Sequence, residues 1–252
     1  GCLIQRLTGN PMASPEVLGI SSGAAFGVVV MLFFVPGDAL AFLLPAGALG
    51  AAGTLLIIML VAGRGGFSPE RMLLAGMALN SAFVTLLMLL LASGDPRMGG
   101  LLSWISGSTY NISSRAAMQS AALALVLTAL APLASRWLTL LPLGSATARS
   151  AGMALNASRL VLMLLAAALT AAATLTIGPL SFVGLMAPHI ARMLGFRRAL
   201  PQMAMAGLFG AGLMLLADWC GRMLAFPDQL PAGLMATFIG APYFIWLLRR
   251  SR

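Results

Sequence analysis

The chain has 252 residues, of which 60% are hydrophobic and only 8% are charged, and its formal net charge is +9. Soluble globular domains carry about 25% charged residues, so this composition excludes that class and indicates a membrane protein. All fifteen basic residues are Arg, and the absence of Lys excludes a P-loop, whose Lys must reach the nucleotide phosphates. One histidine, His189, and two distant cysteines, Cys2 and Cys220, exclude a metal cage or a disulfide framework.

Apolar runs of about 20 residues recur along the chain, and each is long enough to cross a bilayer as an α-helix. The predicted fold class is therefore an all-α, polytopic transmembrane helical bundle, with residues 1–252 as a single domain. In chain order, spans are expected over residues 17–35, 39–62, 69–92, 115–134, 160–177, 200–219 and 232–248. Two shorter apolar helices are expected, one at the membrane interface over residues 98–107 and one over residues 182–194.

The chain starts at Gly1, without Met, inside an apolar segment that ends at a polar turn beginning with Arg6. We expect it to be a piece of a longer polypeptide, cut inside a transmembrane helix. If the turn at Arg6 is cytoplasmic and residues 182–194 count among eight later spans, twelve of the fifteen Arg residues lie on that side. The positive-inside rule then predicts a cytoplasmic C-terminus, and it accounts for the net charge without a nucleic-acid partner.

The run LGSATARSAGMALNASR, residues 143–159, is small, polar and helix-competent, and it carries basic residues but no acid. It separates two long hydrophobic blocks, and the Arg distribution places it in the cytoplasm. A polar segment in that position predicts a surface that meets a cytoplasmic partner. Its small residues would allow the partner to approach closely: Ser145, Ala146, Ala148 and Ala151.

A second candidate region is the helix expected over residues 69–92. It has the pattern of a helix start, with Ser68 as N-cap, Pro69 at the first helical position and Glu70 in the first turn. Five later residues fall on one stripe at i, i+3 or i+4 spacing: Met77, Asn80, Ser81, Thr85 and Met88. The stripe is compatible with a pathway for a large, mildly polar solute. It is also compatible with interhelical hydrogen bonds, each worth about 1 kcal/mol or less.

Two further features are each open to two interpretations. Asp218 and Arg222 are one helical turn apart, so they form either a self-satisfying i,i+4 pair or part of a surface that receives an acidic partner outside. Asp218 is the only acid expected within a span, which argues against a proton- or ion-coupled carrier. His189 has no second ligand nearby, so a histidine hydrogen-bonded at a helix end is favoured over a haem or metal ligand.

No catalytic constellation is visible in the sequence. There is no Ser/His/Asp set, no pair of carboxylates in an apolar segment and no group of ligands with metal-binding spacing. We therefore expect a transport component without an ATPase site and without a cofactor of its own, whose energy comes from a separate subunit.

Three stretches resemble the signatures of one family: GNPMASPEVLGISSGAAFG at 9–27, GPLSFVGLMAPHIARMLGFRR at 178–198 and PAGLMATFIGAPYFIWLLRR at 231–250. They are similar to the iron-siderophore and cobalamin importer permeases, which are ABC transporter membrane subunits of the type II, ten-span kind. The segment SGDPRMGGLLSWISGSTYN is most similar to the ferric hydroxamate members, in which two permease halves are fused. The whole chain resembles their C-terminal half, with the first span and part of the second missing.

The resemblance implies a translocation subunit that moves iron(III)-hydroxamate siderophores across the bacterial inner membrane. The alternatives are the same architecture serving a catecholate siderophore, haem or cobalamin, and, from another class, a secondary carrier. The implied partners are a cytoplasmic ABC ATPase dimer, which binds the ATP and Mg²⁺, a periplasmic siderophore-binding protein, a second permease half and membrane lipid.

The resemblance also assigns expected roles to residues. The loop at 143–159 would dock into a groove of the ATPase through its motif positions: Gly144, Ser145, Ala148, Arg149 and Gly152. Many members carry an acid at or beside Ser145, and this chain has none. The fifth span would line the route, with a cytoplasmic gate at Ser68, Pro69 and Glu70. Arg222 matches a position that holds acidic knobs on the binding protein.

Overall fold

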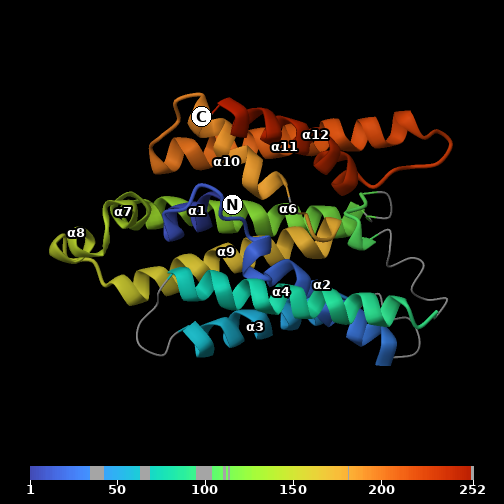
Figure 1. Ribbon diagram of the computed structural model, residues 1–252, viewed down its shortest axis with the longest axis horizontal. Helices are drawn as coiled ribbons and strands as arrows, with labels where there is room; N and C mark the ends of the chain where they lie inside the picture. Colours follow the sequence, from blue (N-terminus) through green and yellow to red (C-terminus); the bar gives the residue numbers. More distant parts are fainter. Residues whose placement is uncertain are drawn as a thin grey trace.

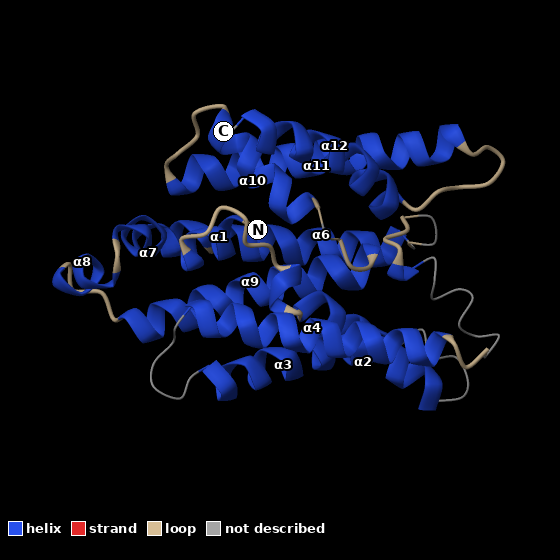
Figure 2. Ribbon diagram, viewed as in Figure 1, coloured by secondary structure: helices blue, strands red, loops and turns tan. Residues whose placement is uncertain are grey.

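The computed structural model describes residues 1–34, 43–62, 69–94, 104–109, 112, 114–180 and 182–250. These parts are helical and contain no strand (Figure 2), which confirms the predicted all-α fold class. The helices, with short 3-10 turns labelled η, are α1 Cys2–Thr8, η1 Glu16–Leu18, α2 Ile20–Phe34, α3 Leu43–Ala62, α4 Pro69–Leu91, α6 Ser114–Ala129, η4 Ala131–Ala134, α7 Ser135–Leu140, η5 Leu141–Leu143, α8 Ser145–Ser150, α9 Leu155–Ile177, α10 Val183–Met193, α11 Ala199–Leu224 and α12 Ala232–Arg250.

The long helices lie side by side along one axis of the bundle (Figure 1). In that view α2, α3 and α4 form one group, α10, α11 and α12 form another, and α9 runs between them. Small residues bring α2 and α3 into close contact: a Cβ on Gly23 would lie 1.8 Å from Thr54 Oγ1, and one on Gly50 would lie 2.1 Å from the Gly23 carbonyl oxygen. Such contacts are typical of helix packing in membranes, where small residues let backbones approach.

Four helical stretches of the described residues are long and apolar enough to cross a membrane: Glu70–Leu91, Ala117–Leu143, Leu155–Ile177 and Ala199–Leu224. Two shorter apolar helices, Ile20–Phe34 and Pro45–Val61, fall where further spans were expected. The span predicted over 115–134 differs, because the apolar path continues through η4, α7 and η5 as far as Leu143. The interfacial helix predicted over 98–107 lies largely outside the described residues.

Helix α10 lies where a short apolar helix was expected, over residues 182–194. It has 11 residues, which gives a length of about 16 Å, roughly half of the hydrocarbon core. In Figure 1 it begins near the middle of the bundle and runs to the end that also carries α8. The helix alone therefore does not cross, although the connections before and after it still lead to opposite ends.

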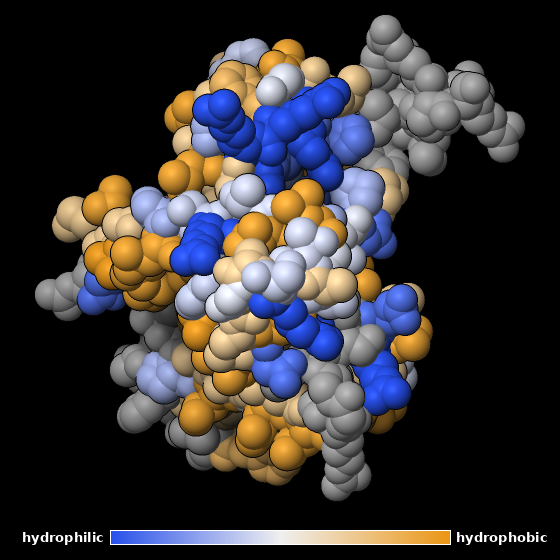
Figure 3. Space-filling view, turned by 90° about the vertical axis from the view of Figure 1, so that its left-hand side faces the viewer, coloured by the Kyte–Doolittle hydropathy of each residue, from blue (hydrophilic) through white to orange (hydrophobic). Residues whose placement is uncertain are grey.

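The bundle has two chemically different ends. The first, here called the α8 end, carries α8 and also the α10–α11 connection (Figure 1). Figure 3 views this end and shows hydrophilic residues gathered on it, with apolar surface around them. The opposite end, here called the Arg222 end, carries the end of α11, the α11–α12 connection and residues 104–109. Arg6 and Arg192 take part in contacts at the α8 end, where Figure 3 shows hydrophilic residues, while the compartment that each end faces stays a prediction.

Candidate functional site

The predicted coupling segment, residues 143–159, folds as the short helix α8, a turn and the first residues of α9. Gly144 and Gly152 flank α8 with φ angles of 100° and 75°. A Cβ on either glycine would meet no atom within 4 Å, so the positive φ and not the space is what favours glycine. The motif glycines thus set where the exposed helix begins and ends.

One face of α8 is held by the core. Ala148 is 0% exposed and belongs to the main hydrophobic cluster together with Met153. The Met153 N–H donates to the Ala148 carbonyl at 3.0 Å, and Arg136 Nη2 donates to the Ala151 carbonyl at 3.1 Å. Ala148 therefore anchors α8 from below, which corrects the expectation that it lets a partner approach closely.

The other face of α8 is open to solvent. Ser145, Ala146 and Arg149 are exposed, and they form the part of the predicted docking surface that a partner can reach. The sequence contains no acidic residue between Asp95 and Asp218. The exposed face of α8 therefore carries the positive charge of Arg149 and no acidic residue of its own.

The predicted stripe on α4 lies partly on the surface and partly in a hollow. Met77 and Met88 are 53% and 57% exposed, and Ser81 and Thr85 are also exposed. The Thr85 hydroxyl donates to the Ser81 carbonyl at 2.8 Å, so it is satisfied within its own helix. Asn80 is half-buried. The stripe is thus one continuous face, as the spacing predicted, and its role as a pathway stays a prediction.

The hollow beside α4 has a volume of about 170 Å³ and is mixed in polarity. Asn80 and Met88 of α4 line it together with Ser21 and Ser22 of α2 and Glu16 of η1. Its remaining walls come from α2, from α4 and from two residues outside the labelled helices, listed here in full: Ala25, Val84, Leu87, Leu91, Ile105 and Pro179. The structure therefore brings two of the five stripe residues together with polar groups from α2 and η1, which the sequence did not link to them.

Of the three predicted gate residues, the structure describes one fully. Glu70 is exposed in the first turn of α4. Ser68 and the side chain of Pro69 lie outside the described residues.

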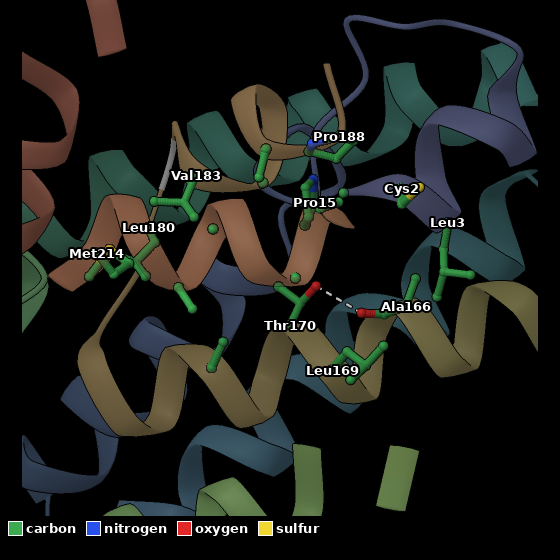
Figure 4. Close-up of a pocket in the computed structure, with 18 of the residues that line it drawn as sticks. Cys2, Leu3, Pro15, Ala166, Leu169, Thr170, Leu180, Val183, Pro188 and Met214 are labelled. Carbon is green, nitrogen blue, oxygen red and sulfur yellow. Dashed lines mark hydrogen bonds between the residues drawn. The ribbon is translucent and has the colours of Figure 1, made fainter. Parts of the chain in front are cut away.

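A larger cavity of about 480 Å³ lies between α9 and the pair α10 and α11 (Figure 4). Its lining is mostly apolar; Thr170, Val183 and Met214 project from those helices, while Cys2 and Leu3 close it from α1. The Thr170 hydroxyl donates to the Ala166 carbonyl of its own helix at 2.7 Å. The cavity offers little beyond apolar contact, and its many small Ala and Gly residues gave no signal in the sequence.

A polar cluster near the α8 end was not predicted. We call Gln5, Arg6, Arg192 and Gln202 the Arg6 cluster. Arg6 donates to Gln202 Oε1 through Nε at 3.1 Å and Nη2 at 2.6 Å, and to the Leu138 and Arg197 carbonyls at 3.1 and 2.6 Å. Arg192 donates to Gln5 Oε1 at 2.8 Å. The cluster joins α1 to α7, α10 and α11, and the only sequence signal was two Gln residues inside apolar segments.

His189 differs from its expected state. It lies inside α10, and its buried Nδ1 has no hydrogen-bond partner in the part of the chain that the structure describes. The expectation of a hydrogen-bonded histidine at a helix end was therefore wrong. The described residues also contain no group of three or more His, Cys, Asp or Glu side chains that would hold a metal ion.

At the Arg222 end, Asp218 and Arg222 form the i,i+4 pair that was one of the two interpretations. Arg222 Nε lies 2.8 Å from Asp218 Oδ2, and Nη2 lies 3.3 Å from Oδ1. The Thr109 hydroxyl also donates to Asp218 Oδ1. The Arg222 side chain keeps 47% of its surface exposed, so the pair does not remove it from solvent. A docking role for Arg222 stays a prediction.

Comparisons with known proteins agree with the helical membrane fold described above. The chain matches the FecCD transport family over residues 1–250. It is 68% identical to the iron(3+)-hydroxamate import system permease protein FhuB of Escherichia coli over its whole length, and also 68% identical to the FhuB protein of Salmonella typhimurium. It covers 38% and 37% of those two proteins, so it spans less than two fifths of their length.

A relative of lower identity and a solved structure also match the chain. The achromobactin transport system permease protein CbrC of Dickeya dadantii is 36% identical, and the chain covers 73% of it. A solved metal-chelate type ABC transporter in an inward-facing conformation superimposes with a TM-score of 0.88 at 29% identity, covering 98% of this chain and 80% of the other. The chain is a multi-pass helical membrane protein with a permease fold, and it belongs to the FecCD transport family.

Proposed function

We propose that the chain is part of the membrane-spanning translocation subunit of an ATP-driven importer for iron(III)-hydroxamate siderophores in the bacterial inner membrane. The observation that carries this proposal is the 68% identity to two FhuB proteins over the whole chain. Permeases named for achromobactin and ferric enterobactin are only 36% and 37% identical. The nearly twofold higher identity to these two FhuB proteins is the basis for proposing a hydroxamate substrate, whereas the hydroxamate permease FhuG of Bacillus subtilis, at 32% identity, does not separate the chelate classes.

The two ends of the bundle receive different partners in this proposal. The α8 end faces the cytoplasm, with the C-terminus on the same side, and an ABC ATPase dimer that binds ATP and Mg²⁺ docks against the exposed face of α8. The absence of an acid near Ser145 means that docking relies on shape, backbone groups and Arg149. The Arg222 end faces the periplasm and receives a siderophore-binding protein.

The substrate route follows α4. Its exposed stripe and the hollow at Asn80 offer methionine, amide and hydroxyl groups, a mixture that suits a chelate with an organic, hydrogen-bonding surface. A second permease half would face this stripe and close the route from the other side. Glu70, with Ser68 and Pro69, lies at the cytoplasmic start of the same helix.

Uptake of three iron or cobalt chelates tests the proposal. Proteoliposomes that contain the assembled importer are supplied with labelled ferrichrome, ferric enterobactin or cobalamin, each with its binding protein. Uptake of ferrichrome alone, dependent on ATP and blocked by vanadate, is the expected result. Uptake of another chelate would identify a different substrate class, and uptake that vanadate does not affect would indicate a secondary carrier.

A further inference from the structure

A short segment at the Arg222 end, residues 104–109, packs backbone to backbone against two helices. A Cβ on Gly178, at the end of α9, would lie 2.0 Å from the Trp104 carbonyl oxygen. The N–H of Gly233, at the start of α12, donates to the Gly107 carbonyl at 2.9 Å. Since glycine is needed for these approaches, the segment cannot shift without moving the helix ends beside it.

Two side chains of this segment point to different functional regions. Ile105 lines the hollow that also contains Asn80 and Met88 of α4. The Thr109 hydroxyl donates to the carboxylate of Asp218, which in turn accepts from the guanidinium of Arg222. A continuous set of contacts thus leads from Arg222, at the surface, to the wall of the hollow.

We propose that Asp218 and Thr109 transmit the binding of an acidic group at Arg222 to the 104–109 segment, and through Ile105 to the hollow. The proposal rests on the proposed function, in which a binding protein docks at this end. Asp218 acts as a positioning residue, because its carboxylate is shared between Arg222 and the Thr109 hydroxyl.

The physical basis is competition between two carboxylates for one guanidinium. Asp218 contacts Arg222 through two nearly parallel hydrogen bonds, at 2.8 and 3.3 Å. An incoming carboxylate repels that of Asp218 and draws the guanidinium toward itself, because like charges a few ångströms apart disfavour each other. Asp218 then changes its contact with Thr109, and the 104–109 segment responds. A substitution can therefore change the response of the hollow without changing the affinity for the binding protein.

Thr109→Val tests the link because it removes the hydroxyl donor and keeps the shape of the side chain. In proteoliposomes with the assembled importer, saturating binding protein should stimulate ATP hydrolysis about fivefold less than in the parent, within the range known for coupling through side-chain networks. The affinity of the binding protein and its salt dependence should stay unchanged. Thr109→Ser keeps the hydroxyl and should restore stimulation, which a purely structural role of a threonine methyl would not allow.

Thr139→Val is the matched control, since the Thr139 hydroxyl donates to the Ser135 carbonyl of its own helix at the α8 end. It should leave stimulation unchanged. If Arg222→Glu does not weaken docking, the proposed docking role is wrong whatever Thr109 does. If Arg222→Glu weakens docking while Thr109→Val keeps full stimulation, the link through Asp218 is overturned and the docking role stands.

A double-mutant cycle gives a second, independent reading. If Thr109 and Asp218 act through their one hydrogen bond, the Thr109→Val, Asp218→Asn double variant should lose no more stimulation than Asp218→Asn alone. Losses that multiply would mean that the two residues act separately, which contradicts the proposal.

Discussion

At the α8 end, Arg6 and Arg192 donate to amide and carbonyl oxygens, whereas at the Arg222 end Arg222 donates to the carboxylate of Asp218. Neutral oxygen atoms accept hydrogen bonds from a guanidinium and leave its charge in place. A carboxylate accepts the hydrogen bonds and also offsets the charge. The α8 end therefore keeps its positive charge within a rigid framework. At the Arg222 end the charge is offset until another acid competes for it. The two ends are suited to different partners: one to constant docking, the other to a contact that forms and breaks.

The largest expected effect is at the anchored face of α8. Ala148→Glu would place an unpaired carboxylate at a position that is 0% exposed, which should cost about 3–5 kcal/mol in the free energy of unfolding. Thermal unfolding of the purified protein measures this, and co-purification of the ATPase shows whether α8 is still presented. Ala146→Glu introduces the same side chain on the exposed face of the same helix and should leave the unfolding temperature nearly unchanged. Equal destabilisation by both would contradict the anchoring role.

The Arg6 cluster gives the next largest effect. Arg6→Ala removes hydrogen bonds to three acceptors, one of them on Gln202, which is only 2% exposed. The expected loss is about 2–3 kcal/mol, because buried acceptors of a charged donor are left unsatisfied. Denaturation in detergent checks the value. Arg198→Ala, at an exposed position on the same end, should cost about 0.5 kcal/mol or less. If Arg198→Ala lowered the free energy of unfolding as much as Arg6→Ala, the loss of positive charge, and not of the hydrogen bonds in the Arg6 cluster, would explain the effect.

A smaller and salt-dependent effect is expected at the Arg222 end. Arg222→Glu should weaken docking of the binding protein by about tenfold at low ionic strength, and by less as salt shortens the Debye length. Binding measured over a range of salt concentrations tests this directly. Arg149→Glu, at the opposite end, serves as the control and should leave docking of the binding protein unaffected. An effect of Arg222→Glu that does not change with salt would contradict a steering role.

The smallest effect concerns the turn after α8. Gly152→Ala should cost about 1 kcal/mol, because an alanine at a φ of 75° is strained even where space is open. Gly207→Ala, also without a neighbour within 4 Å but inside α11, should be neutral or slightly stabilising. Unfolding temperatures of the two variants decide the point. If Gly152→Ala lowered the unfolding temperature no more than Gly207→Ala, backbone strain would not explain the glycine at position 152, and a role in contacting the partner would be favoured.

Hydropathy predicted the helices that depend mainly on length and apolar content. The helices α4, α9 and α11 lie where long apolar runs were found, and α8 appeared as a polar segment between two such runs. Local patterns also predicted the Asp218–Arg222 pair, because both residues belong to one helix and are one turn apart.

What the sequence did not predict depends on contacts between distant residues. The bond between Arg192 and Gln5 joins positions 187 apart, and no local period reports such a pairing. The burial of Ala148 depends on the packing of η5 and α9 against α8, which no local pattern in the sequence records. Thr109 looked like an ordinary loop residue, and only the fold brings it to Asp218.

The Arg6 cluster has a consequence for the order in which the protein assembles. Gln202, the partner of Arg6, is made 196 residues after it. At a synthesis rate of about 5–20 residues per second, the guanidinium waits about 10–40 s for that partner. During this interval α1 cannot reach its final position as a finished helix, so its insertion must be completed after α11 has emerged. Helix α1 is therefore expected to settle into place only after the later helix α11.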